Sequence, residues 1–169
     1  MIKKLKPFIF SLVIVIIDQV TKALVVAYIP ENTVKYSFFN DFLRIVHVRN
    51  SAVAFSLGEG FAMPLKILLF IVLPVILIAF IAYYIVKDEK EFSLFDKYML
   101  AGFVGGGIGN LIDRIFRGMS VVDFISTNNY GLFGMERFPT YNIADASVVV
   151  CVILLLISMI FFKKGKDNE

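Results

Sequence analysis

Four apolar runs of about 20 residues each restrict what this 169-residue chain can fold into. A helix of that length is about 30 Å long, which matches the hydrocarbon core of a bilayer. The apolar fraction of 59% is also higher than is usual for a soluble domain. We therefore expect an all-α integral membrane protein, a single domain over 1–169, with four transmembrane helices. The expected spans cover about 7–29, 65–86, 98–116 and 143–162.

The basic residues are distributed unevenly between the connections. Nine of the 17 Lys and Arg residues lie before the first run, in the short connection 87–97 or after the last run. Basic residues favour the cytoplasmic side. Both termini are therefore expected to be cytoplasmic, and the long connections at about 30–64 and 117–142 to face outward. A net charge of +3 distributed in this way does not indicate nucleic-acid binding.

The first apolar run also has the basic, apolar beginning of a secretory signal peptide. It continues, however, past Asp18 and Lys22 to about Ile29, with no small-residue cleavage site. We expect it to be retained as a span. Cys151 and His47 are the only residues of their kinds, which excludes an internal disulfide and a cysteine-based metal site, and both are expected to serve packing.

The two outward connections differ in composition. The first is rich in β-branched and aromatic residues around a turn at Asn40–Asp41, which predicts strands. The second mixes Gly, Asn and aromatic residues. It is either a mobile flap that touches lipid or ligand or a loop that rests at the membrane interface. The side chains that a flap would present are those of Tyr130, Leu132 and Phe133.

The third run contains two G-x-x-x-G pairs, Gly102 with Gly106 and Gly105 with Gly109. Such pairs let neighbouring membrane helices approach closely. A dinucleotide-binding G-x-G-x-x-G pattern fails because its last glycine is missing and no strand precedes it. The glycines therefore predict close helix packing.

Polar side chains gather where the predicted topology places the outer membrane leaflet. Charged side chains near hydrocarbon cost several kcal/mol and by default mark functional sites. Asp18 and Lys22, four residues apart, share one face of the first helix and are expected to form a buried orienting pair. The full set is Asp18, Lys22, Asn110, Asp113, Arg114, Asp123, Asn142 and Asp145.

Aspartate is the reactive residue type that this set holds in quantity. Two adjacent carboxylates share one proton, so that one can activate a water and the other can donate to a leaving group. Asp123 and Asp145 form the best pair, because each lies outside a helix interior at the membrane edge. Three alternatives stay open: Asp145 with Asn142 as a helix cap only, Asp123 as a loop carboxylate, and Asp113–Arg114 as an interfacial ion pair, the reading that spacing favours for those two residues. From spacing alone, a polar site for transport ranks ahead of a peptidase.

Five sequence blocks, in order, resemble the bacterial lipoprotein signal peptidase (signal peptidase II) family over nearly the full length. They are "DQVTK" at 18–22, "RNSAVAFS" at 49–56, "GGGIGNLIDR" at 105–114, "VVDFI" at 121–125 and "FPTYNIADAS" at 138–147. The resemblance implies an intramembrane aspartyl endopeptidase that cuts prolipoproteins before a diacylglyceryl-modified cysteine. It implies Asp123 and Asp145 as the catalytic dyad, without metal or cofactor. The implied site-shaping and substrate-binding residues are Asp18, Lys22, Asn50, Asn110, Asp113, Arg114 and Asn142.

The family fold adds a small extracytoplasmic β-cradle and a flap, which would map to 33–57 and 126–137. Ala52 and Ala146 depart from the commonest family pattern, and neither replaces a proposed carboxylate. The implied partners are lipidated prolipoproteins and membrane lipid in the bacterial inner membrane, with no nucleic acid. The oligomeric state stays open and a monomer is compatible with it. The competing classes are a small proton-coupled transporter and a non-catalytic membrane scaffold.

Overall fold

A computed structural model describes residues 2–51, 60–87 and 92–161 of the chain. The long helices are α2 (Pro7–Tyr28), α5 (Leu94–Phe116), α6 (Ile143–Phe161) and a continuous helix over Met63–Lys87. This last helix consists of α3 (Met63–Ile67), the π-helical turn η2 (Leu68–Val72) and α4 (Leu73–Lys87). The short elements are α1 (Ile2–Leu5) and the 3₁₀ turn η3 (Leu132–Gly134). The strands are β1 (Val34–Phe38), β2 (Leu43–Asn50) and β3 (Val121–Thr127).

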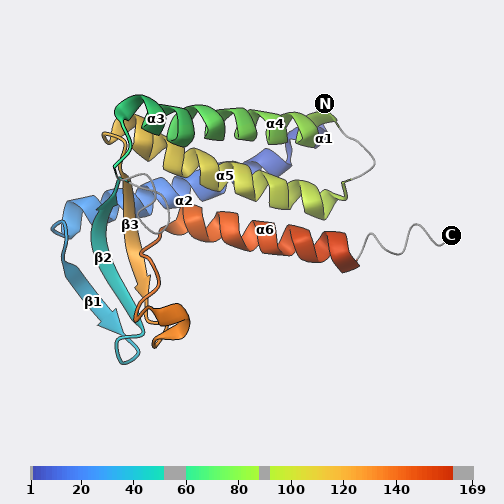
Figure 1. Cartoon of the computed structure of the whole chain (residues 1–169). Helices are drawn as coiled ribbons and strands as arrows, with labels where there is room; N and C mark the ends of the chain where they lie inside the picture. Colours follow the sequence, from blue (N-terminus) through green and yellow to red (C-terminus); the bar gives the residue numbers. More distant parts are fainter. Residues whose placement is uncertain (1, 52–59, 88–91, 162–169) are drawn as a thin grey trace.

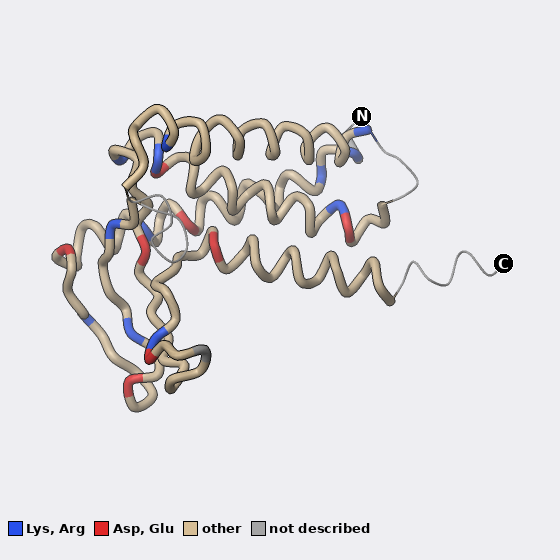
Figure 2. The backbone as a smooth tube through the Cα atoms, viewed as in Figure 1, with Lys and Arg blue, Asp and Glu red and all other residues tan. Residues whose placement is uncertain are grey.

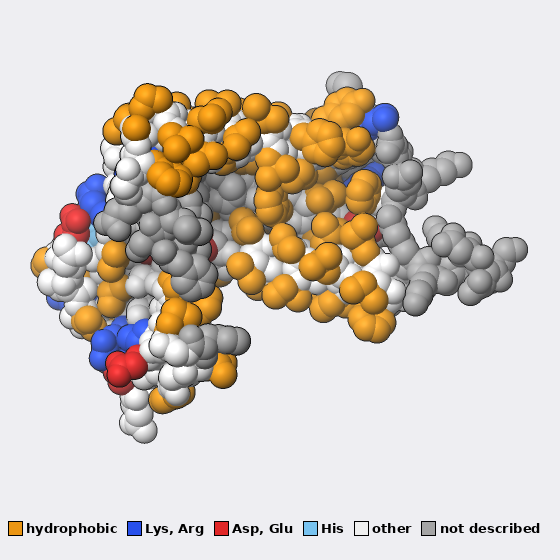
Figure 3. All heavy atoms as spheres, viewed as in Figure 1, with side chains coloured by type: hydrophobic (Ala, Val, Ile, Leu, Met, Phe, Trp, Pro, Cys, Tyr) orange, Lys and Arg blue, Asp and Glu red, His pale blue; other side chains and the backbone are white. Residues whose placement is uncertain are grey.

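The long helices lie side by side, with α5 between the others (Figure 1). By length and composition, three of them can cross a membrane: Pro7–Tyr28, Met63–Lys87 and Ile143–Phe161. Four spans were expected, and α5 is not among these three. The glycines and polar residues of α5 lower its mean hydropathy. Many of these residues are buried, because α5 lies between the other long helices. Apolar side chains cover the visible face of the helical part (Figure 3).

The glycines of α5 bring two helices close to it, as the sequence predicted. A Cβ atom on Gly105 would lie 2.8 Å from the Ser11 carbonyl oxygen of α2. A Cβ atom on Gly106 would lie 2.5 Å from the Ala144 carbonyl oxygen of α6. Since real Cβ atoms do not approach this closely, α5 can hold both neighbours at these distances only with glycine. Cys151 and His47 are buried, as expected of packing residues.

The strands form one antiparallel sheet in the order β1-β2-β3. The predicted turn at Asn40–Asp41 is confirmed, and both residues have left-handed φ angles, 51° and 68°. The sheet runs across one end of the helices and extends beyond α6 (Figure 1). The expected cradle, 33–57, thus contains β1 and β2, and its part at 52–59 lies outside the described residues.

Strand β3 was not predicted from the sequence. Its first four residues are all buried, so neither face shows the polar alternation that reveals a half-exposed strand. Beyond β3, the expected flap region 126–137 contains η3 and folds back on the sheet. Arg137 donates from Nη2 to the Ser126 carbonyl oxygen at 2.8 Å and from Nη1 to the Asp41 carbonyl oxygen at 3.0 Å.

Candidate active site

Asp123 and Asp145 line the same cavity, which has a volume of about 1330 Å³. Asp123 lies on β3 and Asp145 lies in the first turn of α6, so the sheet and the helices each contribute one carboxylate. The guanidinium-bearing Arg114 of α5 lines the same cavity. The other polar residues in its wall include Arg49, Asn50 and Asn110. Sequence reasoning placed Asn110, Arg114, Asp123 and Asp145 at one depth, and all four line this cavity.

Asn142 connects the two aspartates. Its Nδ2 donates to Asp123 Oδ1 at 2.7 Å, and its backbone N–H donates to Asp145 Oδ2 at 3.2 Å. Its Oδ1 accepts from the Asp145 backbone N–H at 2.9 Å, which makes it the N-cap of α6. The predicted cap is thus present. It is not the whole role of Asp145, whose side chain also lines the cavity.

The second oxygen of the Asp123 carboxyl group, and the corresponding oxygen of Asp145, each accept a hydrogen bond from a side-chain amide. Asn50 Nδ2 donates to Asp123 Oδ2 at 3.0 Å, and Asn110 Nδ2 donates to Asp145 Oδ1 at 2.7 Å. These donors come from β2 and α5, so four elements converge on the two carboxyl groups. The positions of both groups are therefore determined by the packing of the sheet against the helices.

Burial of its carboxyl group, and after it the charge of Asp145, raise the pKa of Asp123 to about 7. Hydrogen bonds from Asn50 and Asn142 act in the opposite direction, because they stabilise the carboxylate, as does the charge of Lys22. Because the effect of burial is larger, Asp123 is protonated in most molecules at pH 6 and in about half of them at pH 7. A carboxyl group of this kind can donate a proton near neutral pH.

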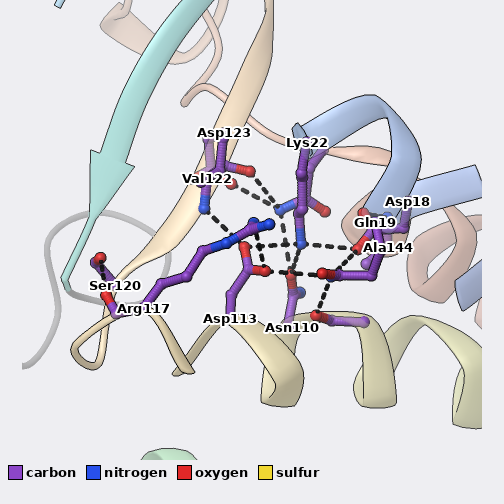
Figure 4. A network of polar contacts seen from close by, with 12 residues as sticks. Asp18, Gln19, Lys22, Asn110, Asp113, Arg117, Ser120, Val122, Asp123 and Ala144 are labelled. Carbon is purple, nitrogen blue, oxygen red and sulfur yellow. Dashed lines mark hydrogen bonds and ion pairs between the residues drawn. The ribbon is translucent and has the colours of Figure 1, made fainter. Parts of the chain in front are cut away.

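A buried ionic network (Figure 4) is joined to the cavity by Asn110, which lines the cavity wall. Lys22 Nζ lies 2.8 Å from Asp18 Oδ2 and 3.2 Å from Asp113 Oδ2, and it donates to Asn110 Oδ1 at 3.0 Å. The side chains of Lys22, Asp18 and Asp113 are fully buried. Asp18 Oδ1 accepts from the Ala144 N–H at 3.0 Å. The predicted Asp18–Lys22 pair is confirmed, and it ties α2 to α5 and α6.

Asp113 anchors the strand that carries Asp123. Its Oδ2 accepts from the Val122 N–H at 2.9 Å, and its Oδ1 lies 2.8 Å from Arg117 Nη1. Gln19 Nε2 also donates to Asp113 Oδ1, at 3.1 Å. Because Val122 immediately precedes Asp123, the network holds the backbone of that aspartate against α5 (Figure 4).

Asp113, which the sequence favoured as an interfacial partner of Arg114, forms ion pairs with Lys22 and Arg117. The guanidinium of Arg114 lies over the ring of Phe70, 4.5 Å from its centroid. Successive helix residues point about 100° apart, so neighbours in the sequence face different surroundings. Asp113 faces the buried network, and Arg114 faces the cavity.

The sequence model described as Signal peptidase (SPase) II matches residues 10–161. The chain belongs to the signal peptidase II family. It is 43% identical to a lipoprotein signal peptidase of Borrelia hermsii (strain HS1 / DAH) over 95% of this chain and 92% of that protein. It is 38% identical to one of Borreliella burgdorferi (strain ZS7), over 96% of this chain and 94% of that protein.

Solved structures support the same assignment. A bacterial membrane enzyme determined at 2.3 Å resolution has a TM-score of 0.78 and 30% identity, over 97% of this chain and 92% of that one. A second, determined at 1.9 Å, has a TM-score of 0.77 and 29% identity, over 92% and 93% of the two chains. As a signal peptidase II family member, the chain is a membrane protease, and its apolar helices fit an inner-membrane protein.

The polar residues predicted for the candidate site all line the cavity or belong to the polar network next to it. Sequence reasoning missed two members of the network, Gln19 and Arg117. Gln19 is part of the "DQVTK" block, which could have singled it out, whereas Arg117 was counted only as a loop charge. Within the described ranges, no group of three or more His, Cys, Asp or Glu side chains is arranged to hold a metal ion.

Proposed function

We propose that the chain is an intramembrane aspartyl endopeptidase that removes signal peptides from diacylglyceryl-modified prolipoproteins, cutting before the lipidated cysteine. The proposal rests on one observation: Asp123 and Asp145 line the same cavity, and both accept hydrogen bonds from Asn142. The names of the relatives, lipoprotein signal peptidases, supply the substrate class.

In the proposed reaction, a water molecule lies between the two carboxyl groups. Asp145, as the carboxylate, takes a proton from the water, whose oxygen attacks the carbonyl carbon of the scissile peptide bond. Asp123, as the neutral acid, donates its proton to the carbonyl oxygen. In the collapse of the tetrahedral intermediate, Asp145 passes its proton to the cysteine nitrogen and the C–N bond breaks. Asp123 regains its proton from one hydroxyl of the intermediate as the new carboxyl group forms. The two carboxyl groups supply all the proton transfers, so the mechanism uses no metal or cofactor.

The roles of the two aspartates differ because their surroundings differ. The raised pKa of Asp123 supports it as the proton donor. Asp145 lies in the first turn of α6, where the positive end of the helix dipole favours an anion. It also accepts hydrogen bonds from Asn110 and from the Asn142 N–H. These donors favour Asp145 as the ionised partner.

In the proposed topology α5 also spans the membrane, which gives four spans with both termini in the cytoplasm. α5 lies alongside the three apolar helices. It runs from the end of the bundle where α4 ends to the end that carries the sheet (Figure 1). The lysine distribution supports the cytoplasmic termini. The cavity then opens at the outer leaflet, where a signal helix and a lipid anchor can enter sideways while water arrives from outside.

The walls of the cavity suit an amphiphilic substrate. Its polar residues lie together near the sheet, and apolar side chains of η2 and α6 line the remainder, among them Leu69, Val148 and Val149. We propose that the apolar part accepts the acyl chains and that the strands hold the polypeptide beyond the cut. The segment 126–137 then serves as the flap over the bound substrate, with Tyr130 and Leu132 exposed on it.

The test is cleavage of a diacylglyceryl-modified precursor by the purified protein in detergent. Asp123→Asn and Asp145→Asn are each expected to abolish cleavage while leaving the thermal unfolding temperature near that of the wild type. Near-normal turnover by either variant would contradict the dyad. A precursor that lacks the lipid serves as the matched substrate control, and its cleavage at an equal rate would contradict the substrate class.

A proton-coupled transporter is less well supported. A relay would thread charged groups through the bilayer. α4 has Lys87 at its end as its only charged residue, and α6 has only Asp145 in its first turn. The charges lie at the two ends of the helical part and in the sheet, and the middle of the described helices shows none (Figure 2). This arrangement suits chemistry at one membrane face.

A further inference from the structure

The helix that faces α5 changes its winding at the candidate active site. Residues Leu68–Val72 form a π-helical turn between α3 and α4. Such turns insert one extra residue into an α-helix and frequently occur at functional sites. Of the five residues in this turn, all of them described, only Phe70 is buried. Its side chain, 7% exposed, lines the same cavity as Asp123 and Asp145.

The ring of Phe70 lies against the charged end of Arg114. The guanidinium carbon is 4.5 Å from the ring centroid, within the range of a cation–π contact. A guanidinium stacked in this way directs its N–H groups outward from its edges. One of them, Nη1, donates to the Met119 carbonyl oxygen at 3.0 Å. The contact and the hydrogen bond both contribute to the orientation of the cation.

The positive charge of Arg114 acts on the acidic groups of the candidate active site. Arg114 lines the same cavity as Asp123 and Asp145, so its positive charge is attracted by both carboxyl groups. By the same reciprocal attraction, a guanidinium fixed here favours an ionised carboxyl group in the cavity. It can also place N–H donors beside a substrate carbonyl. Both effects depend on where the guanidinium lies, because the attraction between charges falls with their separation.

We propose that Phe70 is a positioning residue of the peptidase, which acts by holding the guanidinium of Arg114 beside the two aspartates. The π-helical turn presents the ring, since an extra residue in one turn rotates the side chains around it by about 100° relative to a regular α-helix. The proposal rests on the proposed function, because its readout is precursor cleavage.

The test is a double-mutant cycle in kcat/KM. Phe70→Leu retains an apolar side chain and removes the aromatic face, and it is expected to lower kcat/KM about tenfold, as a cation–π contact of ~1.4 kcal/mol predicts. Phe70→Tyr retains the face and is expected to stay within about threefold of the wild type. In an Arg114→Lys background, where no planar cation remains, Phe70→Leu is expected to have less than about a twofold effect.

Two further variants make the outcome decisive. Phe80→Leu removes an exposed ring from the same helix and is expected to leave kcat/KM unchanged. Phe70→Met repeats the test if the leucine variant does not fold. Equal losses from Phe70→Leu in the wild-type and Arg114→Lys backgrounds, or no loss in either, would overturn the role of Phe70 alone. Absence of cleavage by the wild type would instead overturn the proposed function and this inference together.

Discussion

The side-chain amide of Asn142 donates a hydrogen bond to Oδ1 of Asp123 across 2.7 Å. Asn142 is also the N-cap of α6, so one buried residue both starts a helix and orients a carboxyl group on the sheet. The two roles use different atoms, Nδ2 for the aspartate and Oδ1 for the cap. They can therefore be separated by substitution.

Asn142→Ser is expected to retain the cap and to lose the donor to Asp123. A hydrogen bond to the neutral carboxyl group contributes about 0.5–1.5 kcal/mol, so turnover should fall up to roughly tenfold as Asp123 loses its orientation. Asn142→Ala should lose as much activity and a further ~1 kcal/mol of stability, because the cap is lost as well. Precursor cleavage and thermal unfolding in detergent measure the two effects. Equal unfolding temperatures for the two variants would contradict the separation of roles.

The rate of cleavage is expected to fall as the pH rises through about 7. Asp123 is neutral below its pKa of about 7 and ionised above it, and the proposed mechanism needs the neutral form. Asn50 stabilises the ionised form by a hydrogen bond. Asn50→Leu should raise the pKa and move the alkaline limb of the pH profile of kcat/KM to higher pH. An unchanged limb, or one displaced to lower pH, would count against Asp123 as the acid.

Lys22→Met is expected to destabilise the protein by about 3–5 kcal/mol, because it leaves two buried carboxylates without their shared cation. Asp18 and Asp113 both lie within 3.2 Å of that cation. Adding Asp18→Asn to Lys22→Met removes one of the unpaired charges and should recover part of the loss, since Arg117 still pairs with Asp113. Thermal unfolding of both variants in the same detergent is the measurement. A double variant less stable than Lys22→Met would refute this charge balance.

Gly106→Ala is expected to displace α6 from α5, because its Cβ would lie 2.5 Å from the Ala144 carbonyl oxygen. Overpacking costs about 1–3 kcal/mol, of which better helix propensity offsets up to about 1 kcal/mol. Turnover should fall at least about tenfold, since α6 carries Asp145. Gly60→Ala is the matched control, because a Cβ there would meet no atom within 4 Å. Wild-type turnover by Gly106→Ala would contradict the close approach.

Much of this architecture could be predicted from the sequence. Apolar length fixed three of the spans within a few residues, since a helix must match the thickness of the bilayer. Topology then placed Asp123 and Asp145 at one depth, and Asn142 followed from its position before an apolar helix. These predictions succeed because bilayer thickness and helix caps are local constraints that act on a few neighbouring residues.

Other features could not be predicted, for reasons that differ between residues. β3 is buried on both faces, so periodicity does not reveal it. The partners of Asp113 depend on how α2 rotates against α5, which adjacency in the sequence does not encode. The π-helical turn at Phe70 lies in an apolar run, and the nearby Pro74, which has no N–H for the Phe70 carbonyl four residues earlier, predicts an irregular helix without specifying a π-helical turn.

The hydrogen bond from the Val122 N–H to the Asp113 carboxylate joins the sheet to the helices, two parts of the molecule that are stabilised by different interactions. The helices are held together by membrane-type packing, and the strands by their own ladder. Mild heat or a harsh detergent should therefore loosen this joint first. We then expect cleavage activity to be lost while far-ultraviolet circular dichroism still shows nearly all of the helical signal. Retained helicity would therefore not indicate that a preparation is active.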